Sequence, residues 1–205
     1  MNYLIRYWDR VLELFLQHVQ LTVTVLVIAL AIALPLGILL ARFQALATPV
    51  MGLLGIIYTI PSMALFAMLI PFLGLGAKPA VTALTAYSQV ILVRNVVVGL
   101  QGVDPAVLEA AVGMGMNPWQ VFWRVRLPLA LPVMLAGLRV AAVSVIAIGT
   151  LAAWINAGGL GVLLFEGLYQ YHQAKIVIGT VSVALLSFTV NFLLQWGERR
   201  LRAWN

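Results

Sequence analysis

The chain has 205 residues, of which 63% are hydrophobic and only 9% are charged, and its formal net charge is +6. Soluble domains contain about 45–50% apolar and about 25% charged residues, so this composition excludes an ordinary soluble domain and indicates a protein that crosses a membrane several times. The chain has no cysteine, which excludes disulfides and thiolate metal sites. Its basic residues are scattered and form no basic groove with stacking aromatics, which argues against nucleic-acid binding.

The first 18 residues mix charged and aromatic side chains at helical spacing. Tyr7 and Trp8 lie among Arg6, Asp9 and Arg10, a mixture typical of a helix in the membrane interface with its rings at the level of the lipid headgroups. The order of basic, apolar and small residues that marks a cleavable signal peptide is missing. We therefore expect an interfacial helix over residues 1–18 that is not removed.

Long uncharged runs follow, and a bilayer-spanning helix needs about 20 mainly apolar residues. The sequence predicts an all-α polytopic membrane protein, a single transmembrane domain over residues 1–205 with five spans. The spans are expected near residues 20–41, 50–72, 79–100, 133–155 and 175–196. Pro35 interrupts the first span and Pro61 the second. Such prolines serve as hinges in transporters or only improve packing, and the sequence leaves both roles open.

The segment between the third and fourth spans, residues 104–128, is called the hairpin below. Asp104-Pro105 and Asn117-Pro118 each place a capping side chain before a proline at the first helical position. Two short helices are therefore expected, over about 105–114 and 118–126. Gly113 and Gly115 allow the chain to turn between them.

The composition of the hairpin favours contact with a partner. Ala110 and Ala111 permit close approach, Glu109 supplies one charge, and Trp119 and Trp123 supply the aromatic area that is enriched at interfaces. The alternative is a connector whose aromatic rings lie in the membrane interface. The residues taken alone leave both interpretations open.

The spacing of the hairpin residues adds a resemblance. Glu109-Ala110-Ala111, followed by Gly115 and later by Leu127-Pro128, resembles the EAA loop of bacterial ABC importer permeases, with Val125 where isoleucine is usual. In that family the loop forms coupling helices that insert into a groove on a cytoplasmic ATPase subunit. The resemblance implies the type I importer permease fold. It places Glu109, Ala110, Ala111 and Gly115 at the ATPase contact, with Leu127 and Pro128 fixing the return to the membrane.

A narrower resemblance covers about residues 15–198. The segments Thr59-Ile60-Pro61-Ser62, 71–76, 102–105 and 157–161 look like those of osmoprotectant permeases, which handle glycine betaine, choline and carnitine. Many of these relatives carry a proline in the third span where this chain has Ile91, two residues after Gln89. This departure concerns the kink of that helix and bears on the solute preference.

Four polar residues are candidates for the translocation pathway: Gln89, Arg139, Asn156 and Asn191. Polar groups inside a membrane usually face a bundle interior or a water-filled path. For Gln89, lining the pathway and bonding a neighbouring helix are equally compatible with the sequence. Arg139 is either a cation at a gate or a side chain that snorkels toward the cytoplasm. For Asn156 and Asn191 the favoured interpretation is helix packing.

Two further groups lie near the expected outer side. Glu166, Tyr169, Tyr171, His172 and Lys175 either contact a solute-delivering protein or belong to a short interfacial helix that needs no partner. His18 is interpreted as an interfacial polar residue and not as a metal ligand.

The chain lacks the G-x-x-x-x-G-K-[ST] phosphate-binding loop. We therefore expect no enzymatic activity and no cofactor, with ATP hydrolysis in another chain. The resemblance implies two copies of a cytoplasmic ATP-binding cassette subunit, a second permease subunit of the same or a related kind, and a periplasmic or lipid-anchored solute-binding protein, all assembled in membrane lipid. Two alternatives remain: a permease for methionine or another small solute, and a membrane scaffold that recruits an ATPase without transport.

The basic residues also predict an orientation in the bacterial inner membrane. With the hairpin in the cytoplasm, seven arginines fall inside and four basic residues outside, leaving Arg139 aside, which agrees with the positive-inside rule. The N-terminus is then expected outside and the C-terminus in the cytoplasm.

Overall fold

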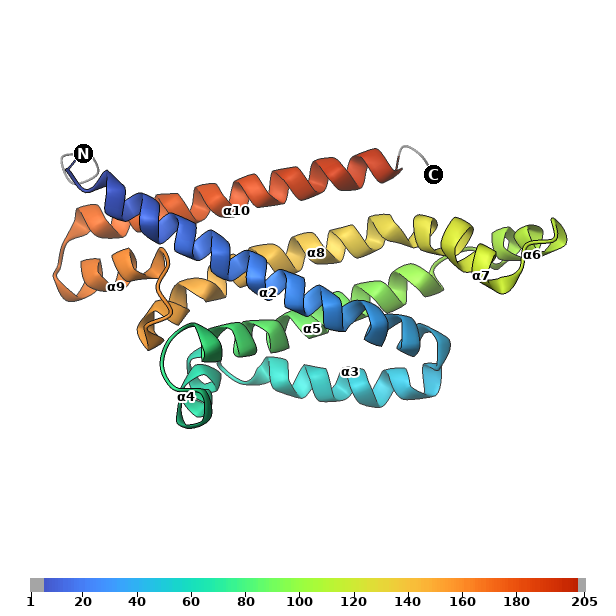
Figure 1. The fold of residues 1–205 in the computed structure, drawn as a ribbon, viewed down its shortest axis with the longest axis horizontal. Helices are drawn as coiled ribbons and strands as arrows, with labels where there is room; N and C mark the ends of the chain where they lie inside the picture. The colour runs from blue at the N-terminus through green and yellow to red at the C-terminus, as the bar shows by residue number, and fades with distance from the viewer. Residues whose placement is uncertain (1–5, 203–205) are drawn as a thin grey trace.

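The computed structural model describes residues 6–202, and no strand occurs in that part of the chain. Figure 1 shows the long helices α2, α5, α8 and α10 running along one another, with α9 at one end of the molecule and α6 and α7 at the other. The elements in chain order are α2 (Trp8–Arg42), α3 (Gln44–Thr59), α4 (Ser62–Leu73), α5 (Ala77–Gln101), α6 (Pro105–Gly113), α7 (Pro118–Val121), the π-helical turn η1 (Phe122–Arg126), α8 (Leu127–Gly149), the 3-10 helix η2 (Thr150–Ile155), α9 (Gly161–Tyr169) and α10 (Gln173–Arg202). The predicted all-α fold is confirmed.

The structure corrects the expected N-terminal interfacial helix. Helix α2 begins at Trp8 and continues to Arg42 without a break near residue 19. Residues 1–5 lie outside the described part. No proline or glycine separates the two segments. The apolar face of the first turns packs against protein, since Val11 and Leu14 are buried in a cluster with Ile146 of α8. Tyr7, Trp8 and Leu12 remain exposed, so burial in the bundle accounts for only part of the helical spacing.

The second predicted span is divided at Pro61. α3 ends at Thr59, α4 begins at Ser62, and the two helices are bent by 94°. Ile60 adopts an extended conformation with φ −66° and ψ 130°, because the residue before a proline is driven away from helical geometry. Pro35, in contrast, lies inside α2 without ending it.

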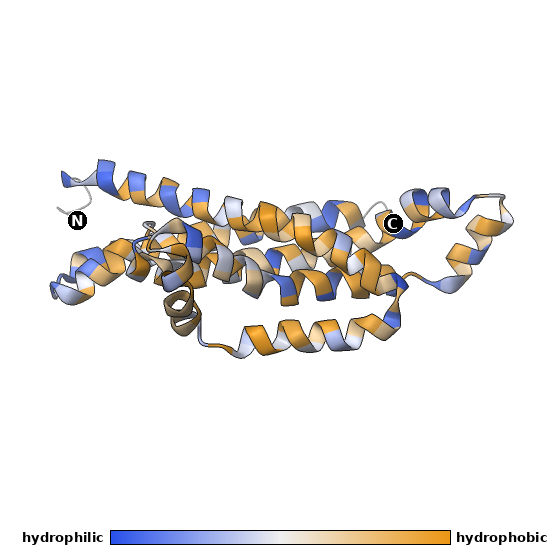
Figure 2. Cartoon of the chain, turned by 60° about the horizontal axis from the view of Figure 1, so that its bottom comes forward, coloured by the Kyte–Doolittle hydropathy of each residue, from blue (hydrophilic) through white to orange (hydrophobic). Residues whose placement is uncertain are grey.

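Four helices are long and apolar enough to cross a membrane, and the bent pair α3 and α4 makes a fifth span if it is taken as one. These are α2, α5, α8 continuing into η2, and α10. Figure 2 shows α3 as a mostly hydrophobic helix along one side of the bundle, and the first turns of α2 as hydrophilic. α3 contains no buried residue, so most of its surface is left for lipid or a partner.

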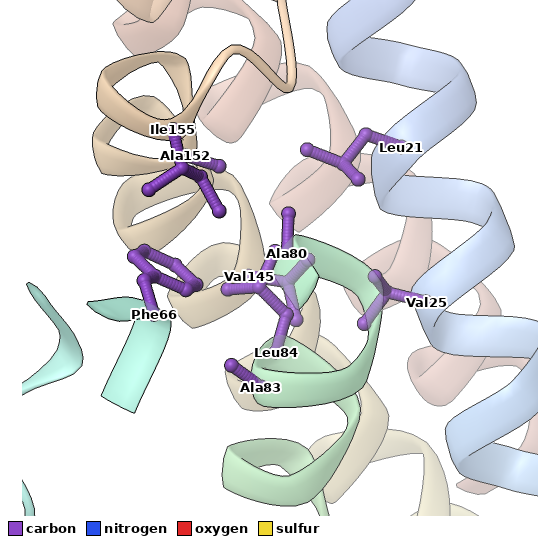
Figure 3. Close-up of a cluster of buried hydrophobic side chains, with 9 residues drawn as sticks. All are labelled: Leu21, Val25, Phe66, Ala80, Ala83, Leu84, Val145, Ala152 and Ile155. Carbon is purple, nitrogen blue, oxygen red and sulfur yellow. The ribbon is translucent and has the colours of Figure 1, made fainter. Parts of the chain in front are cut away.

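A hydrophobic cluster joins five elements on the side of the bundle toward α9. Figure 3 shows its buried side chains converging from α2, α4, α5, α8 and η2. The members are Leu21, Val25, Phe66, Ala80, Ala83, Leu84, Val145, Ala152 and Ile155. Farther along α2, Gly37 allows close approach to α5, since a side chain there would collide with Val96. The cluster fixes α4 and η2 against the long helices.

Candidate functional site

The hairpin begins with the caps that the sequence predicted. The Asp104 carboxylate accepts a hydrogen bond from the Ala106 amide over 2.9 Å, and Pro105 occupies the first turn of α6. At α7, Asn117 and Gln120 form a reciprocal capping box, each side chain accepting from the other's amide over 2.9 Å. These bonds satisfy amides that a helix start otherwise leaves without partners. The two short helices are thus defined locally.

The turn between the helices depends on Gly115 and Ala111. Gly115 has φ +83°, and a side chain there would meet nothing within 4 Å. Conformation therefore explains the glycine, because positive φ is readily adopted only without a side chain. Ala111 is 2% exposed, and its carbonyl accepts from the Met116 amide. Its small side chain thus lies inside the hairpin and not at the expected partner-facing surface.

The other expected contact residues lie on the surface of the hairpin. Glu109, Ala110 and Gly115 are exposed, and Glu109 makes no hydrogen bond or ion pair to the residues described by the structure. Beside them, Met114 is 73% exposed and Trp119 is 70% exposed. Such an apolar and aromatic surface with one charge has the composition of a protein interface. The hairpin can therefore bind a partner through this face.

The hairpin is joined firmly to the long helices. η1 leads directly into α8, where Leu127 and Pro128 are half-buried. The Nε of Arg126 donates to the carbonyl oxygen of Leu100, near the end of α5, over 2.8 Å. A cavity of about 560 Å³ lies between the hairpin and the ends of α2 and α5, with Arg42 and Arg126 among its lining residues. The hairpin is therefore joined to α5 by this hydrogen bond and to α8 by continuous backbone.

The four pathway candidates differ in burial and in their hydrogen bonds. Gln89 is 6% exposed, and its Nε2 donates to Ala29 of α2 over 3.2 Å and to Thr85 over 3.3 Å, so it bonds a neighbouring helix. Asn156 has φ +66° and ends η2 as an exposed turn residue. Asn191 is half-buried on α10. The structure does not bring the four candidates together at one site.

Arg139 forms an ion pair that the sequence analysis missed. Its guanidinium lies 3.6 Å from the carboxylate of Glu198, whose side chain is 8% exposed, so the pair links α8 to α10. Three arginines, Arg199, Arg200 and Arg202, follow Glu198 within four positions. Nothing in this local spacing identifies Glu198 as the partner of Arg139. Only the packing of α10 on α8 selects it as the partner.

His18 is also placed differently from the expectation of an interfacial side chain. It is fully buried, with Nε2 3.1 Å from the Ile146 carbonyl oxygen and Nδ1 accepting from the Leu160 amide over 3.3 Å. The change from α8 to η2 directs the Thr150 amide to Ala147, which leaves the Ile146 carbonyl to His18. The ring thereby joins α2 to α8 and to the turn before α9.

The outer group divides between a charged cluster and exposed rings. Glu166 of α9 pairs with Arg10 of α2 and, over 2.7 Å, with Lys175 of α10. Tyr169 and Tyr171 are 70% and 93% exposed. Glu166 and Lys175 therefore hold α9 in place, and the tyrosines point away from the bundle. No group of three or more histidine, aspartate or glutamate residues suited to a metal ion occurs in the part of the chain that the structure describes.

The sequence of the chain was compared with models of known protein families. The family described as "Binding-protein-dependent transport system inner membrane component" matches residues 33–203. This chain belongs to that family. The permease is accordingly a multi-pass inner-membrane subunit of an ABC importer.

Relatives of the permease carry names that state a solute. It is 40% identical over 185 residues to the carnitine transport permease protein OpuCB of Listeria monocytogenes, covering 90% of this chain and 85% of that protein. It is 38% identical to the choline transport system permease protein OpuBB of Bacillus subtilis, with the same coverage. It is also 38% identical to the osmoprotectant import permease protein OsmW of Salmonella typhimurium, covering 89% of this chain and 87% of that one.

Solved structures show the same fold for the permease. A chain of the MetNI methionine ABC transporter in an inward-facing conformation has a TM-score of 0.84 at 22% identity, covering 93% of this chain and 95% of that chain. An amino acid ABC transporter crystallised with histidines has a TM-score of 0.73 at 20% identity, covering 97% of each chain. At these identities the likeness concerns the fold, and the predicted importer permease architecture is confirmed.

Proposed function

We propose that the permease carries osmoprotectants, the quaternary ammonium solutes represented by glycine betaine, choline and carnitine. One observation carries this proposal: the chain is 38–40% identical, over about nine tenths of its length, to permeases named for carnitine, choline and osmoprotectant transport. A methionine permease is supported only by fold likeness at 22% identity. The non-transporting scaffold has no observation in its favour.

The exposed face of the hairpin docks into the cytoplasmic ATPase. Glu109, Ala110 and Gly115 lie at this contact, and Ala111 supports it from inside by letting the two short helices approach. Leu127 and Pro128 set the return to the membrane through α8. This assignment is supported by the exposure of Glu109 and Met114. The amides at the starts of α6 and α7 are already capped within the hairpin, so these exposed side chains are not needed for its folding.

The working importer contains two permease subunits, two ATPase subunits and a solute-binding protein that delivers the solute. ATP binding closes the ATPases and moves the hairpins, which shifts the pathway toward its outward-facing state, and hydrolysis resets it. The permease itself carries out no chemistry. Its role in each cycle is to convert displacement of the hairpin into displacement of α5 and α8, through the Arg126 bond to Leu100 and the continuous η1–α8 backbone.

The hairpin lies in the cytoplasm and the N-terminus outside. Arg42 and Arg126 line one cavity at the hairpin end of the bundle, and Figure 1 shows α10 ending toward the same end, whereas α2 begins at the end with α9. Clustering of arginines at one end supports a cytoplasmic location for that end.

The proposal is tested by reconstituting the permease with its ATPase and binding protein in proteoliposomes. ATP-dependent uptake of radiolabelled glycine betaine, choline and carnitine is expected, with methionine as the comparison solute. Uptake of methionine alone would replace the solute assignment. An ATPase that binds the permease while no solute is taken up would support the scaffold instead.

A further inference from the structure

A pair of tyrosines holds the bend between α3 and α4. The Tyr87 hydroxyl of α5 donates to the carbonyl oxygen of Ile60 over 2.6 Å, in the extended link that Pro61 creates. The Tyr87 ring meets the Tyr58 ring of α3 edge to face, with centroids 5.8 Å apart and an interplanar angle of 84°. Tyr87 thus fixes both the broken backbone and the orientation of the Tyr58 ring.

Tyr87 lies well inside α5, and Tyr58, the penultimate residue of α3, meets it there. Tyr87 follows the first residue of α5 by ten positions, which is about 15 Å along a helix that rises about 1.5 Å per residue. Breaks of this kind in the helices of transporters are tolerated where they adjoin protein or a water-filled cavity, since lipid leaves backbone groups without partners.

The two rings differ in exposure. Tyr87 is 5% exposed, whereas Tyr58 is 44% exposed. Tyrosine and tryptophan are enriched where a membrane meets water, and the other such residues in the described part of the chain lie toward helix ends or in the hairpin. They are Tyr7, Trp8, Trp119, Trp123, Trp154, Tyr169, Tyr171 and Trp196. Tyr58 also lies at a helix end, beside the break at Pro61, but unlike the others it contacts a ring ten positions inside α5.

The Tyr58 hydroxyl has no hydrogen-bond partner among residues 6–202. Exposing such a group to hydrocarbon is unfavourable, so the exposed side of this ring is better suited to a path that contains water and solute. A small pocket beside the ring is lined by Tyr58, Tyr87, Ser88, Ser144 and Ile91 among others.

We propose that the exposed face of Tyr58 contacts the quaternary ammonium group of the solute during its passage through the membrane. A trimethylammonium group has no N–H to donate, so an aromatic face is a chemically suited partner through cation–π attraction. Tyr87 acts as a positioning residue, because it orients the Tyr58 ring and holds the backbone bend. This assignment rests on the proposed function, since it requires a quaternary ammonium solute.

The test replaces Tyr58 with phenylalanine and with phenylalanines that carry one, two and three ring fluorines, in the complete importer with unmodified ATPase and binding protein. Fluorine withdraws charge from the ring face while nearly preserving its size. ATP-dependent choline uptake is expected to fall stepwise with fluorine number, reaching a loss of about threefold or more with three fluorines, since cation–π attraction supplies about 0.5–2 kcal/mol.

The same fluorinated series at Tyr87 is the matched control, because it perturbs the same ring pair at a buried position. Choline uptake by the fluorinated Tyr87 variants is expected to stay near that of Tyr87→Phe, without a stepwise loss. Uptake that does not fall with fluorine number at position 58, or that falls equally at position 87, overturns the assignment of Tyr58. Failure of the unmodified importer to take up any quaternary ammonium solute would instead reject the proposed function, so the two outcomes are separable.

Discussion

The Nε of Arg126 and the carbonyl oxygen of Leu100 lie 2.8 Å apart, and this hydrogen bond joins the end of the hairpin to the end of α5. The same guanidinium borders the cavity beneath α2. The bond thus joins the hairpin to the helix that also carries Tyr87 and Gln89.

We expect Arg126→Met to uncouple the importer. A hydrogen bond to a charged donor contributes about 1.5–3 kcal/mol, and methionine has no N–H that could replace the Nε donor. Uptake per ATP hydrolysed should fall severalfold while the ATPase still co-purifies. Arg124→Met, which removes the same charge from an exposed neighbour, is the control and should leave this ratio near the wild-type value. Equal ratios in both variants would contradict the assigned role of Arg126.

Charge reversal at Glu109 should weaken ATPase binding. Glu109 is exposed and has no partner within residues 6–202, so its replacement should leave folding of the permease unchanged. Glu109→Lys is expected to reduce both co-purification of the ATPase and uptake, with Glu109→Gln giving a smaller loss because it adds no repulsion. Full co-purification with Glu109→Lys would remove this residue from the interface.

Substitutions at Gly115 distinguish two reasons for a glycine there, its backbone conformation and the small size needed at the ATPase contact. The space around the glycine is open, but its φ is +83°, which costs a β-branched residue about 1–3 kcal/mol. Gly115→Val should therefore destabilise the hairpin and abolish most uptake, and Gly115→Asn should retain a large part, since asparagine tolerates this conformation. Proteolysis of the hairpin and uptake measure the two effects. If Gly115→Asn fails as completely as Gly115→Val while the hairpin resists proteolysis, bulk at the ATPase contact is the cause.

Replacing His18 should lower stability without preventing assembly. The ring is fully buried and bonds Ile146 and Leu160. His18→Leu leaves both backbone groups without this partner, at about 1–3 kcal/mol for each buried group. A decrease of several degrees in the midpoint of thermal unfolding in detergent is expected. Asn191→Leu, at a half-buried position on α10, serves as the comparison. An equal decrease there would show that the hydrogen bonds of His18 make no particular contribution to stability.

The natural absence of cysteine allows a direct test of orientation. Met114→Cys in the hairpin and Tyr169→Cys at the end of α9 introduce single thiols at positions that are 73% and 70% exposed. A membrane-impermeant thiol reagent applied to spheroplasts should label position 169 and reach position 114 only after the membrane is opened. Labelling in the reverse pattern would invert the proposed topology.

The hairpin shows how far local sequence determines structure. Asp104, Asn117 and the prolines that follow them cap helices through contacts two or three residues away, so the sequence predicts these helices without knowledge of the fold. The break at Pro61 follows from the proline's effect on its neighbour, again within one residue. The run of apolar residues likewise predicts helices that cross a membrane.

The role of individual polar residues depended on the tertiary structure. His18, Gln89 and Arg139 find partners 128, 60 and 59 positions away respectively, in Ile146, Ala29 and Glu198. Local spacing carries no signal for such pairs. Burial also reassigned Ala111 from the surface to the inside of the hairpin, and Val11 and Leu14 of α2 from the membrane interface to the bundle.

Sequence by itself therefore determined the class of the protein, its capped hairpin and its broken second span, because these follow from composition and from interactions between near neighbours. Tertiary structure alone decided which side chains face one another across helices. Tyr58 and Tyr87 meet only because the bend at Pro61 brings the end of α3 against α5.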